Sequence, residues 1–89
     1  MKRLSFADIA SLALGQVFYE EERGVLVRLT LSYIPTIKII HHSDGDWTQM
    51  EWRGKTREGE ELTFLMTKEL SYYGPFIFRD ERGRKKKHP

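Results

Sequence analysis

The sequence contains no cysteine, and this absence excludes disulfide bonds, cysteine-ligated zinc and thiol catalysis together. It fits a reducing compartment, and we expect a cytoplasmic protein. Long apolar runs are also lacking, because no segment approaches the ~20 consecutive apolar residues that span a bilayer. The apolar stretch at residues 9–14 is too short and too lightly flanked for a signal peptide. We therefore expect a soluble chain with no membrane partner.

The spacing patterns of common catalytic and cofactor sites are missing as well. The seven glycines are scattered at predicted turns rather than clustered ahead of a helix, so no phosphate-binding loop is expected. No Gly-x-Ser-x-Gly motif is present, and one of the three histidines lies in the C-terminal tail. No pair of carboxylates is spaced to fix a nucleophile against a base. We therefore predict that the protein is not an enzyme and needs no cofactor.

Positive charge is present mainly at the C-terminus. Residues 80–89 contain five Lys or Arg and two acidic residues, a net charge of +3 out of a total of +2, which leaves −1 on residues 1–79. The body is thus nearly neutral, and the basic residues form a tail. We expect this tail to be disordered and to bind nucleic acid only non-specifically. Its cationic residues are Arg82, Arg84, Lys85, Lys86 and Lys87.

A short amphipathic helix is predicted near the N-terminus. Ser5 and Asp8 match the capping pattern of a helix start, and apolar residues follow at helical spacing. Gly15 supplies a stop signal. We predict a helix over residues 5–14 that packs one face on a sheet.

Alternation of apolar and polar residues predicts the strands. In residues 25–33 the odd-numbered positions, Tyr33 included, are apolar or aromatic, which is the period-2 pattern of a strand with one buried face. Pro35 then marks a strand end, a bulge or an edge, because it cannot donate to a ladder. Asp44-Gly45 predicts a two-residue type I′ hairpin. The predicted strands are residues 17–20, 25–34, 36–42, 47–53, 60–67 and 76–78, with turns at 21–24 and 57–59 and a helical turn or 3₁₀ connection at 68–74.

These elements predict a mainly β (α+β) fold in one domain, residues 1–79, with five or six antiparallel strands and one short helix. A small twisted sheet tends to curl into an SH3-like or OB-like barrel, or to remain a curled sheet, because curling protects its edges. In a chain of 89 residues most large apolar side chains are needed for the core. Edges that stay unprotected would also allow a homodimer.

His41 and His42, with Asp44 and Asp46 nearby, come nearest to a metal-binding cluster. Adjacent residues of a strand point to opposite faces, so the two imidazoles cannot reach one ion without a local kink. We predict no metal site, and interpret these residues as the polar end of a strand beside a turn.

The two tryptophans are predicted to lie on opposite faces of one strand. We assign Trp52 and Met50 to the core, which leaves Trp47 at least partly exposed unless the N-terminal helix covers it. An exposed tryptophan is a candidate anchor, because tryptophan is enriched among interface hot spots. The residues expected at a contact surface are Trp47, Gln49 and Glu51, with His41 or His42 and the Tyr72-Tyr73 turn nearby.

Several motifs resemble small, largely uncharacterised proteins of tailed bacteriophages, which open with Gly-x-Val-Phe/Tyr-Tyr-Glu and close on a His/Tyr-Tyr-Gly-Pro turn. The matching parts here are Leu14-Gly15-Gln16-Val17-Phe18-Tyr19-Glu20, residues 24–31, and Tyr73-Gly74-Pro75 before a final Phe-x-Phe. The similarity covers about residues 14–78 and consists of turn and core residues, so no functional residue is carried over. It implies a phage setting, in which small accessory proteins are often host-takeover or anti-defence factors that act by stoichiometric binding.

We therefore predict a non-enzymatic binding module that neutralises a host protein or sequesters a small defence ligand. A second hypothesis from another class is a nucleic-acid-binding accessory protein that uses the barrel face and the basic tail. The two differ in one property, because binding through tail cations weakens steeply with salt.

Overall fold

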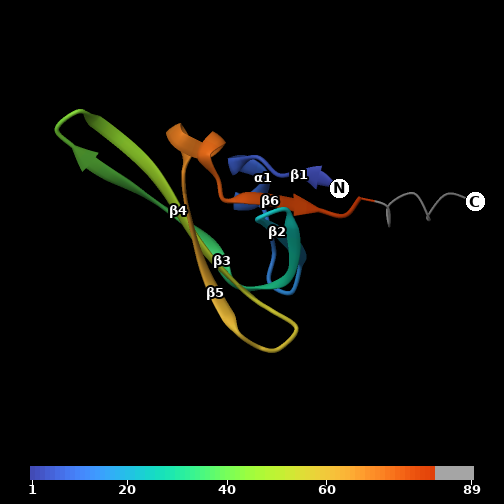
Figure 1. The fold of residues 1–89 in the computed structure, drawn as a ribbon. Helices are drawn as coiled ribbons and strands as arrows, with labels where there is room; N and C mark the ends of the chain where they lie inside the picture. The colour runs from blue at the N-terminus through green and yellow to red at the C-terminus, as the bar shows by residue number, and fades with distance from the viewer. Residues whose placement is uncertain (82–89) are drawn as a thin grey trace, which may run out of the picture.

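The computed structural model describes residues 1–81, which form one antiparallel sheet and two short helices. The strand order is β1-β6-β2-β3-β4-β5, so the first and last strands of the chain pair at one side of the sheet (Figure 1). The strands are β1 (Lys2–Arg3), β2 (Val17–Glu22), β3 (Val25–His42), β4 (Gly45–Lys55), β5 (Glu61–Thr67) and β6 (Phe76–Arg79), and the helices are α1 (Phe6–Ala10) and the 3₁₀ segment η1 (Lys68–Tyr73).

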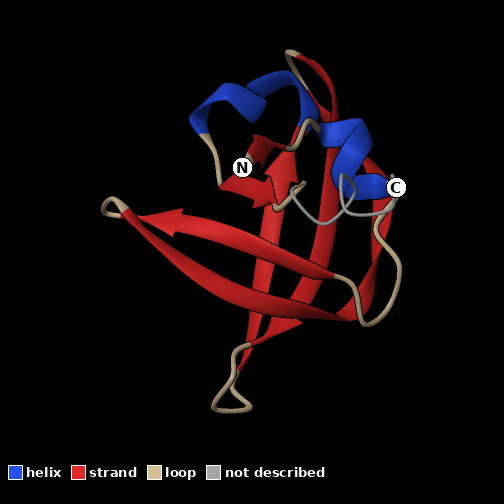
Figure 2. Ribbon diagram, turned by 90° about the vertical axis from the view of Figure 1, so that its right-hand side faces the viewer, coloured by secondary structure: helices blue, strands red, loops and turns tan. Residues whose placement is uncertain are grey.

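The predicted mainly β fold with a short N-terminal helix is confirmed. The sheet has six strands and curls strongly, and both helices lie at the same end of it (Figure 2). Within the described residues β1 and β5 are the two edges and do not pair with each other, so the sheet stays open. The architecture is therefore a curled sheet rather than a closed barrel.

The core fills the inner face of the curled sheet. Trp52 is fully buried, as its parity predicted, and stacks on Phe64 with ring centroids 5.5 Å apart. Phe18 meets the same ring edge-on at 5.7 Å. Ile9 brings α1 into this cluster, which explains why the helix lies against the sheet. The other buried side chains are Leu4, Leu12, Leu29, Leu31, Met50, Met66 and Ile77.

The helix α1 is shorter than the predicted 5–14. Its start is as expected, because the Asp8 backbone N–H donates to the Ser5 hydroxyl at 3.1 Å and the Ser5 N–H donates to the Asp8 carboxylate at 3.0 Å. It ends at Ala10, and Gly15, with φ of 83°, serves instead to bring the chain alongside β3. There the Gly15 N–H donates to the Leu31 carbonyl at 2.9 Å. The predicted helix end at residue 14 is therefore four residues too late.

The two hairpins of β3 differ in their turns. Between β2 and β3, Arg23 and Gly24 both have positive φ, 52° and 80°, as a type I′ turn requires. β2 consequently runs on to Glu22, two residues beyond the predicted end. The prediction of a type I′ turn centred on Asp44-Gly45 is wrong, because His42 pairs with Gly45 and the connection is residues 43–44.

The predicted burial of Tyr33 is wrong as well. The β3–β4 register shifts between Leu31 and Tyr33 and again between Tyr33 and Thr36. Pro35 lies in this irregular stretch, which agrees with the bulge among its three predicted roles, and β3 continues through it. The first shift turns Tyr33 to the outer face, where the Arg53 guanidinium lies 4.9 Å from the centre of its ring.

Candidate functional site

The outer part of the β3–β4 hairpin projects from the sheet as an arm, which we define as residues 36–42 and 45–51. It extends to the upper left of Figure 1, away from β6 and the N-terminus. β2 pairs with β3 only as far as Thr30, and β5 ends at Thr67 opposite Gln49. Beyond those points the hairpin is a ribbon of two strands, with η1 beside β4 on one of its faces.

The inner face of the arm carries two half-exposed isoleucines. Ile37 pairs with Met50 and Ile39 pairs with Thr48, so both lie on the same face of the hairpin as the core residue Met50. Their exposed fractions are 51% and 52%, although Met50 itself is fully buried. The core face thus continues along the arm without a covering layer. We call Ile37 and Ile39 the isoleucine surface.

The outer face of the arm holds a shallow pocket of about 300 Å³ around Trp47. Trp47 pairs with Ile40 across the hairpin, and the His42 ring stands nearly perpendicular to the indole at 6.3 Å. The indole N–H donates to the Asp44 carboxylate at 3.5 Å, the long limit of a hydrogen bond. The lining of this Trp47 pocket is Ile40, His42, Asp44, Trp47, Gln49, Thr67 and Leu70.

Glu69 holds one wall of the pocket in place. The Thr48 backbone N–H lies just past the end of β5, and it donates to the Glu69 carboxylate at 3.0 Å. This backbone hydrogen bond is the main reason that the pKa of Glu69 lies below its ordinary value. The side chain thereby replaces a missing strand partner and keeps η1, with Leu70, beside β4. The predicted cover for Trp47, helix α1, does not line the pocket.

Of the sequence-predicted contact residues, Trp47, Gln49 and His42 come together in the Trp47 pocket. His41 lies on the opposite face of the arm, where its Nδ1 is 2.8 Å from the Asp46 carboxylate. Glu51 shares the outer face but does not line the pocket, and lies 3.5 Å from the Arg53 guanidinium. The expected surface is therefore divided between the two faces of the arm.

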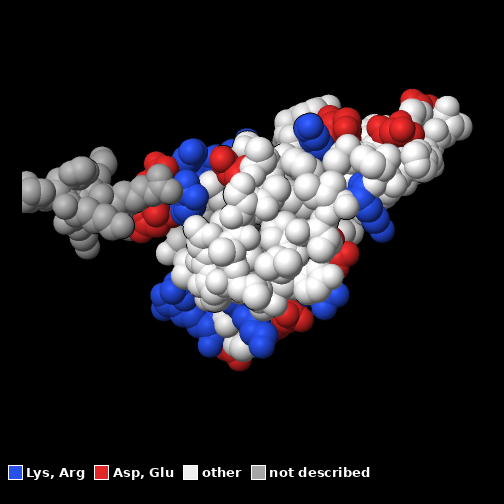
Figure 3. Space-filling model, turned by 180° about the vertical axis from the view of Figure 1, so that it is seen from behind, with Lys and Arg blue, Asp and Glu red and all other residues white. Residues whose placement is uncertain are grey.

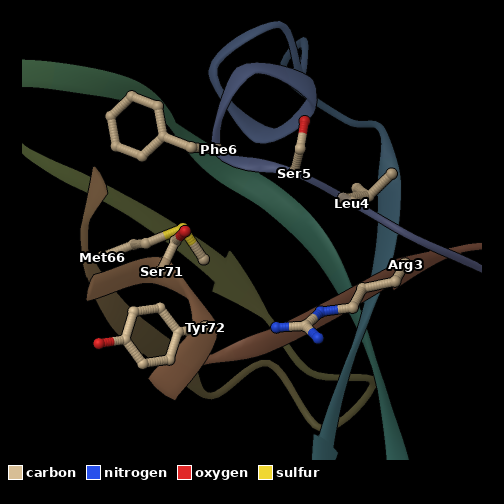
Figure 4. A pocket seen from close by; sticks show the side chains of 7 residues that line it. All are labelled: Arg3, Leu4, Ser5, Phe6, Met66, Ser71 and Tyr72. Carbon is tan, nitrogen blue, oxygen red and sulfur yellow. The ribbon is translucent and has the colours of Figure 1, made fainter. Parts of the chain in front are cut away.

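Tyr72 and Tyr73 do not line the Trp47 pocket. Their rings lie against each other, 4.3 Å between centroids, and both are well exposed. Tyr72 borders a different pocket of about 360 Å³, between η1 and the N-terminal segment. Figure 4 shows the Tyr72 side chain on one side of this pocket, with Phe6 and Arg3 on the other. The full lining is Arg3, Leu4, Ser5, Phe6, Met66, Ser71 and Tyr72.

The residues that sequence reasoning missed are Ile37, Ile39, Asp44 and Leu70. The strand lengths are the signal that could have found the first two, because β3 and β4 have 18 and 11 residues, whereas β2 and β5, which flank this hairpin, have 6 and 7. A hairpin so much longer than the strands that flank it has to project beyond them. Leu70 had no such signal, because its place depends on the contact between Glu69 and Thr48.

Within residues 1–81 no three His, Asp or Glu side chains come together as a set that could hold a metal ion. Neither helix of that part has the length and apolar content needed to cross a membrane. The tail residues Arg82, Arg84, Lys85, Lys86 and Lys87 lie outside the described residues. No protein-family model, no curated protein and no solved structure matches the chain.

Proposed function

We propose that this chain is a small, non-enzymatic binding module that docks on a protein partner through its arm. The observation that supports this proposal is the isoleucine surface at the base of a two-stranded ribbon. An exposed apolar surface carried on a projecting element is typical of a protein interaction site. A two-stranded hairpin is only marginally stable in water, so a partner would gain affinity by covering it.

The ionisable groups favour binding over catalysis. Three described carboxyl groups have a displaced pKa, and each displacement has a structural cause. The pKa of Asp8 is lowered by the Ser5 backbone N–H, that of Glu69 by the Thr48 N–H, and that of Glu20 is raised by partial burial. They lie on α1, η1 and β2 and share no pocket. This distribution is unlike an active site, where perturbed groups converge.

The setting that we propose is a phage-infected cell, with the protein in the host cytoplasm, and this part rests on the resemblance to phage accessory proteins. A module of this size would act by occupying a host protein in equal amounts. A protein partner suits the site better than a sequestered small ligand, because the Trp47 pocket is at the lower end of the ~300–1,000 Å³ range of small-molecule sites.

The test is affinity capture from host lysate with three forms of the chain. The wild type is expected to retain one host protein in equal amounts, and the double variant Ile37→Lys, Ile39→Lys is expected to lose it. The matched control is Leu65→Lys, because Leu65 is also half exposed, at 50%, but lies on β5 opposite Glu51, on the other face of the sheet from the isoleucine surface. Retention by the double variant, or no stoichiometric protein at all, would refute the proposal.

Two further measurements on the same samples separate the competing assignments. Mass spectrometry of extracted small molecules would detect a retained ligand in place of a protein. Light scattering on the wild type and the double variant would show whether a second copy covers the isoleucine surface. Capture that disappears on nuclease treatment would favour the nucleic-acid-binding accessory protein.

A further inference from the structure

The Trp47 pocket combines apolar walls with one acidic group. Ile40, Leu70 and the Trp47 indole provide the apolar surface, and the Asp44 carboxylate lies at the edge of the indole. Within residues 1–81 no Lys or Arg lines the pocket. We propose that it takes the side chain of an arginine or lysine of the partner protein, an inference that rests on the proposed function.

The shape of a basic side chain fits this lining. Arg and Lys have an apolar stem and a cationic head, and they commonly lay the stem on apolar surface while the head stays polar. Here the stem would contact Ile40 and Leu70, and the head would lie between the indole and Asp44. A tryptophan ring attracts a cation more strongly than the other aromatic rings do. The volume of about 300 Å³ suits one side chain.

The charges around the pocket favour a cation. The Asp44 carboxylate has one long contact, 3.5 Å to the indole nitrogen, although a carboxylate can accept about four hydrogen bonds. Asp46 adds a second negative charge at the tip but lies on the opposite face and does not line the pocket, and acidic atoms gather at the end of the arm in Figure 3. Lys38 opposes a cation, since it pairs with Gln49 on the same face, but it does not line the pocket.

An apolar anchor is the competing occupant, and Asp44 decides against it. An aliphatic side chain would cover the apolar walls but would give the exposed Asp44 carboxylate no donor. It would therefore leave the charge of Asp44 unused. A basic side chain covers the same apolar walls and also supplies the donor.

The test uses blocked tripeptides of the form acetyl-Gly-X-Gly-amide, with X as Arg, Lys, norleucine or Glu, titrated into ¹⁵N-labelled protein. The observed signals are the two indole N–H resonances. We expect Arg and Lys to shift the Trp47 resonance with millimolar affinity, norleucine to bind about tenfold more weakly, and Glu not to bind. The Trp52 resonance serves as an internal control for folding, because that side chain is fully buried.

Asp44→Asn and Asp46→Asn form a matched pair of variants. Both remove one negative charge from the tip, but Asp46 lies on the opposite face beside His41. We expect Asp44→Asn to weaken Arg binding about fivefold, the size of a partly exposed ion pair, and Asp46→Asn to change it by less than twofold. Equal losses in the two variants would overturn the site, as would equal binding of norleucine and Arg. Binding of tetramethylammonium as tight as that of the peptides would overturn the docking role in favour of a free small cation.

The same variant separates this inference from the proposed function. If Asp44→Asn loses the Arg tripeptide but still captures the host protein in full, the basic anchor is wrong and the binding module stands. If neither wild type nor variant captures a protein while the tripeptide result holds, the proposed function fails and the pocket chemistry remains.

Discussion

Adding one methyl group at Gly54 is expected to destabilise the fold. A Cβ built there would lie 2.6 Å from Cζ and 2.9 Å from Cε1 of Phe18, and 3.1 Å from Cβ of Leu29. Phe18 cannot move away easily, because it is fully buried and its ring meets Phe64 edge-on. Overpacking of this kind costs about 1–3 kcal/mol. In a domain of this size we expect Gly54→Ala to lower Tm by about 4–24 °C.

The steric contact and the effect of alanine on the unfolded chain change the stability in opposite directions. Gly54 does not have positive φ, so without the contact an alanine would stabilise the chain by about 0.4–1 kcal/mol through the unfolded state. Thermal unfolding followed by circular dichroism measures the difference. Phe18→Leu is the partner for a double-mutant cycle, because a shorter side chain makes room for the new methyl. We expect the double variant to lose at least 0.5 kcal/mol less than the sum of the single variants. A Tm that stays level or rises in Gly54→Ala would refute the steric argument.

The remaining predictions concern the tryptophans, the helix cap and the tail. Trp52→Ala should lower the free energy of unfolding by about 3–5 kcal/mol because it leaves a large cavity, and Trp47→Ala should lower it far less. In variants that keep only one tryptophan, iodide should quench the fluorescence of Trp47 more strongly than that of Trp52. Equal quenching would contradict the placement of Trp52 in the core and Trp47 at the surface. The hydrogen bond from the Ser5 backbone N–H is the main reason that the pKa of Asp8 is lowered. The ionised Asp8 therefore stabilises the fold at pH values above its ordinary pKa of 3.8, and this stabilisation is lost as the pH falls through the pKa of the folded state. The Tm of Asp8→Asn should therefore fall less than the Tm of the wild type as the pH is lowered. Curves of Tm against pH that run parallel for the two proteins would contradict this role of Asp8. Ending the chain at Arg79 should shift Tm by only a few degrees and remove any salt-sensitive binding of oligonucleotides, whereas tight, salt-resistant binding by that form would favour a nucleic-acid function of the sheet.

The local sequence pattern was sufficient to predict the structure where the backbone is regular. The opposite faces of Trp47 and Trp52 followed from period-2 alternation because β4 is regular between them: residues 45–51 pair with β3, and residues 49–55 with β5, without a register shift. The cap formed by Ser5 and Asp8 depends on residues three apart, so it too could be predicted. Such features need no knowledge of the tertiary fold.

Other features depend on contacts that a local pattern does not contain. β1 is two residues long, too short for any periodicity, and exists because Lys2 and Arg3 pair with β6 at the far end of the chain. The Tyr72-Tyr73 turn was expected near Trp47, but η1 presents Tyr72 to the N-terminal segment instead. The sequence therefore predicted the site residues that share one strand, but not those that tertiary contacts bring to the pocket.

The irregular stretch around Pro35 determines which side chains each face of the arm presents. Shifting the register of a strand by one residue exchanges its two faces. From Leu31 to Ile37 β3 advances six residues while β4 advances four, from Gly54 to Met50, so β3 carries two extra residues. Two shifts restore the original parity, and the isoleucine surface continues the core face. One shift would have placed those isoleucines beside Trp47 and joined all the apolar surface of the arm on one face. Because there are two, the arm presents an apolar surface on one side and the Trp47 pocket on the other, and a partner that uses both has to wrap around the ribbon.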